Sequence, residues 1–195
     1  KIHSWQPKNV SLKICWEISS TALLNIWYSK LRASITATSR YLPDHIMTNF
    51  ELEKMVNTSD EWIKSRTGIT ERRIVHKGQT TADMSTSIAK ELLQRSNTDP
   101  EEVEVIIIAT VTPDMATPAT ASLVQDRIGA IKAWGFDLSG ACTGFIYALD
   151  TATRMIESGK YKKVMVIGVD TMSSVLDYSD RNTCVLFGDG GGGVM

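Results

Sequence analysis

The sequence has few cysteines, and their spacing follows no pattern. Its 195 residues hold three, Cys15, Cys142 and Cys184, at long and unequal intervals. An odd number of cysteines so widely spaced cannot form the disulfide framework of a small secreted domain. The sequence also lacks C-x-x-C and H-x-x-x-H pairs, so the common zinc-binding patterns are excluded. These absences favour a reducing compartment.

Long hydrophobic runs and an excess of one charge are also missing. No run reaches the ~18 apolar residues of a membrane-spanning helix. Lys and Arg number 21 and Asp and Glu number 22, for a net charge of −1, so there is no overall basic field for nucleic acid. With 43% hydrophobic and 22% charged residues, the composition is globular and excludes disorder, collagen and coiled coil.

Glycine is absent from the first third of the chain, and this absence accompanies a change in composition. The first of 13 glycines is Gly68, whereas three of the five tryptophans lie within residues 1–30. We therefore interpret residues 1–30 as an unmatched extension, either foreign sequence or a targeting segment, before a domain over residues 31–195. The chain begins with Lys1 and stops within an apolar stretch, which predicts a fragment open at both ends.

From residue 31 onward, β-like runs alternate with helical periodicity. Val103–Val111 is nearly continuous in β-branched residues, which is typical of a strand buried on both faces of a parallel sheet. The other expected elements are strands at Ile35–Tyr41, Ala133–Leu138 and Lys163–Val169 and helices at Thr80–Ser96, at Ala119–Ile128, from about Gly140 to Ser158, and at starts near Thr48 and Ser59. This alternation predicts a layered α/β fold with right-handed crossovers.

A run of glycines lies close to the end of the chain. Gly188–Gly193 satisfies the dinucleotide pattern G-x-G-x-x-G, but four consecutive glycines satisfy almost any glycine template, and no helix-forming segment follows. Asp189 and Gly190 lie between two apolar runs, which instead predicts a hairpin-like turn after an apolar strand at Cys184–Phe187.

Cys142 is the candidate nucleophile. An expected strand runs through small residues into an expected helix, with Cys142 at the turn between them. There a thiol meets unpaired N–H groups and the positive end of the helix dipole, which favour the thiolate. The small neighbours Gly140 and Gly144 would let a substrate carbonyl approach, and a free N–H could stabilise an oxyanion. A buried structural cysteine is the competing interpretation, and the residues alone leave both open.

Three separated motifs add a resemblance to a known family. They are Thr58–Ile69 (TSDEWIKSRTGI), Phe136–Phe145 (FDLSGACTGF) and Asp180–Gly190 (DRNTCVLFGDG). In order and spacing, these motifs closely resemble those of β-ketoacyl-acyl-carrier-protein synthase III. The resemblance covers about residues 31–195 and corresponds to the N-terminal half of that family's thiolase-like fold. It implies a layered α/β/α domain with a mainly parallel central sheet.

The resemblance implies thioester exchange at Cys142. In that family the cysteine takes an acyl group from acyl-CoA, and a carbanion from decarboxylated malonyl-acyl carrier protein then attacks the acyl-enzyme, with release of CO2 and CoA. This acyltransferase reaction initiates fatty-acid synthesis. The implied partners are acyl-CoA, acyl carrier protein and a second copy of the chain in a homodimer. No cofactor, metal, membrane or nucleic acid is implied, because the CoA thioester is itself a substrate.

The family's condensing step uses a His and an Asn from its C-terminal half, and neither is found here. The three histidines of this chain, His3, His45 and His76, all precede Cys142 and match no such motif. We expect His45 and His76 to be solvated in loops.

Four residues in the matched motifs are implied to bind CoA. Trp62 resembles the family's tryptophan that stacks on the adenine, with Arg181 on the other face of the base. Thr58 and Arg66 resemble residues that contact the CoA head. Stacking, cation–π attraction and cation–phosphate pairing suit these residue types. The alternatives are that Trp62 anchors a helix to the core and that the arginines form surface ion pairs.

The sequence departs from the family's pattern at two places. That family commonly has Ala where this chain has Gly191 and Gly193, which predicts a looser turn beside the nucleophile. Thr117 falls where members often carry a larger apolar residue that closes the acyl pocket across a dimer interface. Thr117 therefore predicts that longer or branched primers are accepted.

Two other functions compete with the favoured one. Another thiolase-like synthase, of polyketide or hydroxymethylglutaryl type, would share the cysteine motif but not the set Trp62, Arg66 and Arg181. A noncatalytic fragment that binds CoA or oligomerises is the alternative of another class. The expected location is the cytoplasm, or a plastid if residues 1–30 are a transit peptide.

Overall fold

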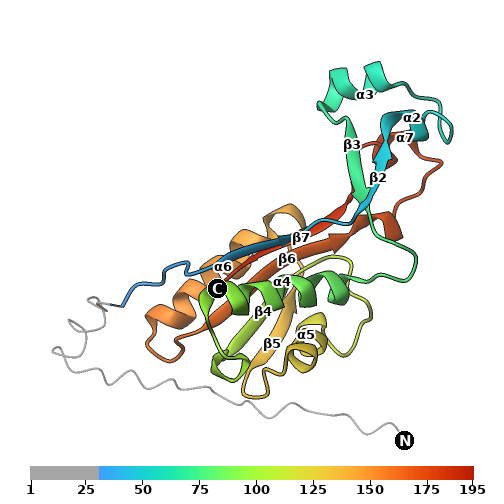
Figure 1. Ribbon diagram of the computed structural model, residues 1–195. Helices are drawn as coiled ribbons and strands as arrows, with labels where there is room; N and C mark the ends of the chain where they lie inside the picture. Colours follow the sequence, from blue (N-terminus) through green and yellow to red (C-terminus); the bar gives the residue numbers. More distant parts are fainter. Residues whose placement is uncertain (1–30) are drawn as a thin grey trace, which may run out of the picture. The chain divides into compact units, whose positions relative to one another are not determined.

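The computed structural model describes residues 31–195, which form a five-stranded main sheet and a separate two-stranded sheet (Figure 1). Residues 1–30, interpreted above as an extension, lie outside the described residues. In spatial order, the strands of the main sheet are β1 (Thr38–Tyr41), β7 (Asp189–Val194), β6 (Val164–Thr171), β4 (Val105–Ala109) and β5 (Trp134–Leu138). β4 is parallel to β5 and β6, whereas β7 is antiparallel to β6 and β1. The predicted parallel core is confirmed within a mixed sheet.

β4 lies at the centre of the core, because all five of its residues are buried. Ile106 and Ile108 belong to a hydrophobic cluster with residues of α4 and α5, whereas Val105 and Ile107 belong to a second cluster with residues of α6. Successive residues of a strand point to opposite faces, so helices cover both faces of this one. The three helices are α4 (Thr81–Ser96), α5 (Thr120–Ile128) and α6 (Gly144–Glu157). The result is the α/β/α layering that the sequence predicted.

Local sequence determines where α4 begins and where α4 and α5 end. Thr80 caps α4: its hydroxyl accepts a hydrogen bond from the Asp83 N–H, and the Asp83 carboxylate accepts one from the Thr80 N–H. Asn97 ends α4 and Gly129 ends α5, both in the left-handed conformation, with φ of 49° and 75°. Both helices match their predicted ranges, except that the first predicted residue of each is its cap.

A second group of elements, here called the small lobe, lies beyond the N-terminal end of β7, at Asp189 (Figure 1). Its core contains the buried residues Leu52, Ile63, Cys184 and Val185. Its elements are β2 (His45–Thr48), α2 (Asn49–Leu52), α3 (Asp60–Thr67), β3 (Glu71–Ile74) and α7 (Arg181–Cys184). Short 3₁₀ turns elsewhere are η1 (Pro100–Glu102), η2 (Ala141–Thr143) and η3 (Met172–Ser174). The small lobe therefore combines an early and a late part of the chain.

Two expectations for the end of the chain are wrong. Cys184 does not lie in a strand but ends helix α7, which begins where the Asp180 carboxylate accepts a hydrogen bond from the Asn182 N–H. The glycine run is not a loose turn, because it forms β7, which is paired with β1 on one edge and β6 on the other. β7 lies so close to β6 that glycine is favoured in β7, because a Cβ on Gly193 would lie 2.9 Å from the Val166 carbonyl oxygen.

Within residues 31–195, no helix combines the length and the apolar character needed to cross a membrane.

Gly188 joins the small lobe to β7 and has no space for a side chain. A Cβ here would lie 2.9 Å from the Arg72 Cβ and 2.9 Å from the Arg73 carbonyl oxygen, both in β3. We expect Gly188→Ala to lower the free energy of unfolding by about 1–3 kcal/mol. Gly192→Ala is the matched control, because its Cβ would meet only the Ser39 carbonyl oxygen, at 3.4 Å. Urea unfolding followed by circular dichroism measures both, and equal losses of stability would contradict the prediction.

Candidate active site

Cys142 lies in the turn that joins β5 to α6. The helix expected from about Gly140 begins instead as the 3₁₀ turn η2 and continues as α6 from Gly144. Cys142 is exposed, so its interpretation as a buried structural cysteine is wrong. The thiol thus lies at the beginning of a helix, where backbone N–H groups lack intrahelical partners.

The turn around Cys142 holds a strained backbone. Ala141 has a φ of 47°, a left-handed conformation that costs residues other than glycine about 1–2 kcal/mol. Thr143 holds this turn closed, because its N–H and its hydroxyl both donate to the Gly140 carbonyl oxygen, at 3.2 and 2.9 Å. The position of the cysteine is therefore fixed by its two neighbours in the sequence.

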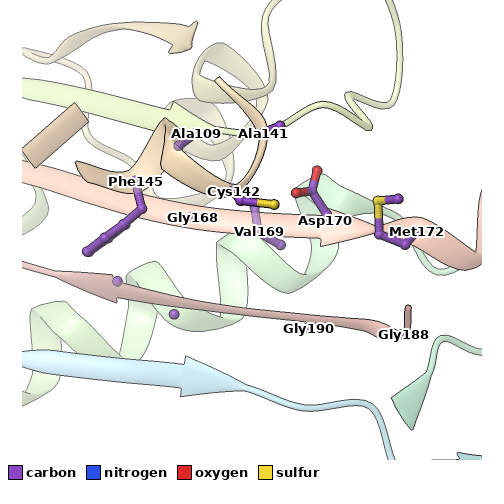
Figure 2. A pocket seen from close by; sticks show the side chains of 12 residues that line it. Ala109, Ala141, Cys142, Phe145, Gly168, Val169, Asp170, Met172, Gly188 and Gly190 are labelled. Carbon is purple, nitrogen blue, oxygen red and sulfur yellow. The ribbon is translucent and has the colours of Figure 1, made fainter. Parts of the chain in front are cut away.

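Cys142 lines a cavity of about 500 Å³. Residues of β6 and the glycine run of β7 line it as well. Figure 2 shows the Cys142 side chain above β6, with Phe145 on one side of it and Asp170 and Met172 on the other. A cavity of this volume is within the range of small-molecule sites. Because several of its lining residues are glycines, the space beside the sulfur is open to a ligand.

Asp170, near the end of β6, is a cavity residue that the sequence analysis missed. Its Oδ1 accepts hydrogen bonds from the Thr110 hydroxyl (2.9 Å), the Val111 N–H (2.8 Å), and the N–H and hydroxyl of Thr112 (3.2 and 2.9 Å). It therefore fixes the segment that follows β4 against the end of β6. A signal for it existed, because ligand sites of parallel sheets lie at the carboxyl ends of the strands.

Asp137, in the same motif as Cys142, stabilises the start of helix α5. Its two carboxylate oxygens accept hydrogen bonds from the N–H groups of Thr120 and Ala121, at 2.6 and 2.8 Å. These are the first two residues of α5, so Asp137 satisfies donors that the helix leaves free. It does not line the cavity at Cys142.

The structure brings together three of the four predicted CoA-binding residues. The guanidinium carbons of Arg181 and Arg66 lie 4.9 and 5.7 Å from the centre of the Trp62 ring. We call these three residues the CoA clamp, after the ligand that the sequence analysis predicts for them. Both distances are within cation–π range, and among residues 31–195 neither arginine forms an ion pair. The alternative that the arginines form surface ion pairs is therefore not observed. The alternative that Trp62 anchors its helix does hold beside the cation–π contacts, because Trp62 packs against the core of the small lobe.

Thr58, the fourth predicted residue, comes just before α3, the helix that carries Trp62. Its hydroxyl oxygen is buried and has no hydrogen-bond partner among the described residues. The N-cap of α3 is instead Ser59, whose hydroxyl accepts a hydrogen bond from the Trp62 N–H at 3.1 Å. The Thr58 hydroxyl is therefore not used in capping this helix.

Thr117 is exposed in the segment between β4 and α5 and is absent from the wall of the cavity at Cys142. The structure of one chain therefore does not place it at the nucleophile.

Among residues 31–195, neither Cys184 nor the two histidines line the cavity. Cys184 is buried in the small lobe, and this burial raises the pKa of its thiol. His45 begins β2 rather than lying in a loop, and both it and His76 are exposed. Within the described part of the chain, no cluster of three His, Cys, Asp or Glu residues could hold a metal ion. Cys15 and His3 lie outside the described residues.

The sequence matches curated proteins over most of its length. The sequence profile of 3-oxoacyl-[acyl-carrier-protein (ACP)] synthase III matches residues 136–195. Over 166 residues, or 85% of this chain, the sequence is 57% identical to beta-ketoacyl-[acyl-carrier-protein] synthase III of Chlorobium phaeovibrioides (strain DSM 265 / 1930). The aligned part is 50% of that relative, so the chain spans about half the length of the curated relatives it matches.

Solved structures share the fold. The structure of 3-oxoacyl-[acyl-carrier-protein] synthase III from Aquifex aeolicus VF5 has a TM-score of 0.80 and 54% identity, covering 82% of this chain and 52% of that one. The priming β-ketosynthase of the R1128 polyketide biosynthetic pathway has a TM-score of 0.81 and 34% identity, covering 84% and 49%. The layered sheet with an exposed cysteine at the start of α6 is thus a thiolase-like domain. In sequence and fold, residues 31–195 are similar to about half of a β-ketoacyl-[acyl-carrier-protein] synthase III.

We expect Cys142 to be the more reactive of the two described cysteines. Its side chain is exposed, whereas Cys184 is buried and its raised pKa reduces the thiolate fraction near neutral pH. Limited treatment with iodoacetamide at neutral pH, followed by peptide mapping, should show alkylation of Cys142 at least about tenfold faster. Cys142→Ser is the control and should abolish the fast reaction. Faster labelling of Cys184 in the folded chain would contradict this prediction.

Proposed function

We propose that Cys142 accepts an acyl group from acyl-CoA and that the whole protein uses the acyl-enzyme in the initiating condensation of fatty-acid synthesis. The observation that carries the proposal is the exposed thiol at the start of α6, on the wall of a cavity, in a chain similar to about half of a synthase III. The activity is that of an acyltransferase. The CoA thioester is its substrate, and the chemistry of acyl transfer needs no cofactor.

Acyl transfer at this site needs only the cysteine and the beginning of its helix. The thiolate sulfur of Cys142 attacks the thioester carbonyl carbon and forms a new C–S bond. The bond from that carbon to the CoA sulfur then breaks, and CoA leaves as a thiolate that takes up a proton. Negative charge on the carbonyl oxygen develops near the N-terminal end of α6, where free N–H groups and the helix dipole favour it.

The condensing half of the reaction is assigned to the whole protein. There, decarboxylation of malonyl-acyl carrier protein generates the carbanion that attacks the acyl-enzyme and releases CO2. Within residues 31–195, no histidine lines the Cys142 cavity. We therefore assign acyl transfer to the described part, and the groups that assist condensation to the half of the longer relatives that the chain does not match.

The nucleotide part of CoA is assigned to the small lobe. The Trp62 ring offers a stacking surface for adenine, and Arg66 and Arg181 offer charges for phosphate. At 4.9 Å the Arg181 guanidinium already contacts the ring, so the base enters between them only if Arg181 moves outward. The buried Thr58 hydroxyl has no hydrogen-bond partner among residues 31–195, which supports a ligand contact at the start of α3.

A polyketide-type synthase is the second candidate, because the chain is also similar to the R1128 priming β-ketosynthase. The identity is 34% there, against 57% with the Chlorobium phaeovibrioides synthase III. The higher identity and the presence of the CoA clamp favour the fatty-acid enzyme.

We further propose that the protein acts as a homodimer. β5 is an edge strand of the main sheet, and Trp134 on this strand and the nearby Ile131 are exposed. An unpaired strand edge with exposed apolar side chains suits pairing with a second copy. Because Thr117 is exposed and outside its own chain's cavity, we assign it to the acyl pocket of the partner copy.

The proposal also covers the bounds of the domain and the compartment of the protein. We assign the condensing-enzyme domain to residues 31–195 and treat residues 1–30 as an extension outside it, because the composition changes between the two parts. Cys142 and Cys184 are free, which suits a reducing compartment such as the cytoplasm.

Radiolabelled acetyl-CoA is expected to acylate Cys142. The measurement is acid-stable label on the protein, located by peptide mapping. Cys142→Ala should lose the label, and Cys184→Ala, the matched control, should keep it. An unlabelled wild-type chain that still binds CoA would support the noncatalytic alternative, and label that persists in Cys142→Ala would place the chemistry elsewhere.

Thr117→Phe is expected to shift primer choice toward short chains. Each methylene of the primer that a pocket buries contributes about 0.8 kcal/mol, so losing space for two or three carbons changes selectivity roughly tenfold or more. The measurement is the rate of acyl-enzyme formation from octanoyl-CoA divided by that from acetyl-CoA, in a dimeric sample. Met115→Phe, at an exposed position of the same segment, is the control. An unchanged ratio in Thr117→Phe would show that Thr117 does not set chain length.

A further inference from the structure

We propose that Arg72 and Asn49 are positioning residues that hold the two sides of the CoA clamp in register. The proposal rests on the proposed role of that clamp in binding the nucleotide part of CoA. It assigns the affinity for this nucleotide to a buried hydrogen-bond network below the clamp, in addition to the residues that touch the ligand.

Arg72 is a buried cation in the small lobe. Only 6% of it is exposed, and among residues 31–195 it forms no ion pair. Its Nη2 donates to the Asn49 side-chain oxygen at 2.9 Å and to the Val185 carbonyl oxygen at 3.0 Å. Burying a charge against neutral groups costs free energy. A guanidinium is nevertheless suited to this position, because its several N–H donors can hold different segments at once.

Asn49 connects this guanidinium to the Trp62 side of the clamp. Its Nδ2 donates to the Asp60 carboxylate at 2.9 Å and to the Ile69 carbonyl oxygen at 2.8 Å. Asp60 is the first residue of α3, and Trp62 lies in the first turn of that helix. The amide of Asn49 therefore accepts from Arg72 and donates to α3. A carboxylate of the same shape could only accept.

Val185 connects the same guanidinium to the Arg181 side of the clamp. Val185 follows directly after α7, the four-residue helix that carries Arg181. A helix this short has no stability of its own, so its direction depends on contacts at its ends. Arg181 also donates to the Asn57 carbonyl oxygen at 3.0 Å, in the segment before α3. Two helices far apart in the sequence are thus attached to Arg72, α7 through the Val185 carbonyl and α3 through the Asn49 side chain.

The network is separate from the reacting centre. Neither Arg72 nor Asn49 lines the cavity at Cys142. Loss of the network should therefore weaken binding of CoA, which carries the nucleotide. It should leave the acylation of Cys142 by acetyl-pantetheine unchanged, because that thioester has no nucleotide. A general loss of structure would impair both.

The test measures two quantities on the same chains. One is the Kd for CoA by calorimetry, and the other is the rate of Cys142 acylation by acetyl-pantetheine. Two variants break the network: Arg72→Met removes the donors, and Asn49→Asp keeps the shape but places a second carboxylate beside Asp60. We expect each to raise the Kd for CoA about tenfold and to change the acetyl-pantetheine rate by less than about twofold. Arg73→Met, at the next position of β3, is the matched control and should change neither.

Two reference variants make the outcomes distinct. Trp62→Ala should raise the Kd for CoA as the network variants do. If Trp62→Ala weakens CoA binding while Arg72→Met and Asn49→Asp do not, the positioning role is overturned and the proposed function stands. If Arg72→Lys restores wild-type affinity, charge rather than geometry is responsible, and the positioning role is also overturned. Failure of acetyl-CoA and acetyl-pantetheine to acylate Cys142 in the wild type would instead refute the proposed function, whatever the CoA affinities.

Discussion

The burial of β4 on both of its faces is the constraint on which the rest of the structure depends. A strand with no polar face must have helices on both sides and strands on both edges, and these are α4 and α5, α6, β5 and β6. Because β4, β5 and β6 are parallel, their carboxyl ends lie at one edge of the sheet. Cys142 follows β5, Asp170 lies near the end of β6, and Thr112, which donates to Asp170, follows β4. A single packing requirement thus brings Cys142 and Asp170 to the same cavity.

The small lobe is joined to this edge by one buried carboxylate. Asp189, the first residue of β7, accepts hydrogen bonds from the Val75 N–H and the Ser173 N–H, both at 2.8 Å. Val75 follows β3 of the small lobe, and Ser173 lies just beyond the end of β6. CoA, which belongs to the proposed substrate, is a long molecule with its reacting sulfur at one end and its nucleotide at the other. The position of the clamp relative to Cys142 therefore matters as much as either site alone, and Asp189 helps to fix it.

Elements with their own physical signal could be predicted from the sequence, and those without one could not. The β-branched run at Val103–Val111 and the cap at Thr80 gave a strand and a helix close to those observed. β7 was mistaken for a turn because glycine has neither apolar periodicity nor strand propensity, and the strand exists only through its two neighbours. Within the site, Cys142 was found because a turn between strand and helix is a local feature. Asp170 and Arg72 were missed because their partners are distant in the sequence.

The strain at Ala141 shows how stability and function are divided in this fold. Glycine would adopt the φ of 47° without a steric penalty, yet it would also give the turn before Cys142 more conformations in which the sulfur is misplaced. Alanine in a left-handed conformation persists only where surrounding contacts determine it, and here the two hydrogen bonds from Thr143 to Gly140 do so. The same hydrogen bonds that hold Ala141 in its strained conformation also make the turn rigid. A small cost in folding free energy thus keeps the Cys142 sulfur, the proposed nucleophile, in one place at the start of α6, while affinity for the nucleotide part of the proposed substrate is assigned to the small lobe.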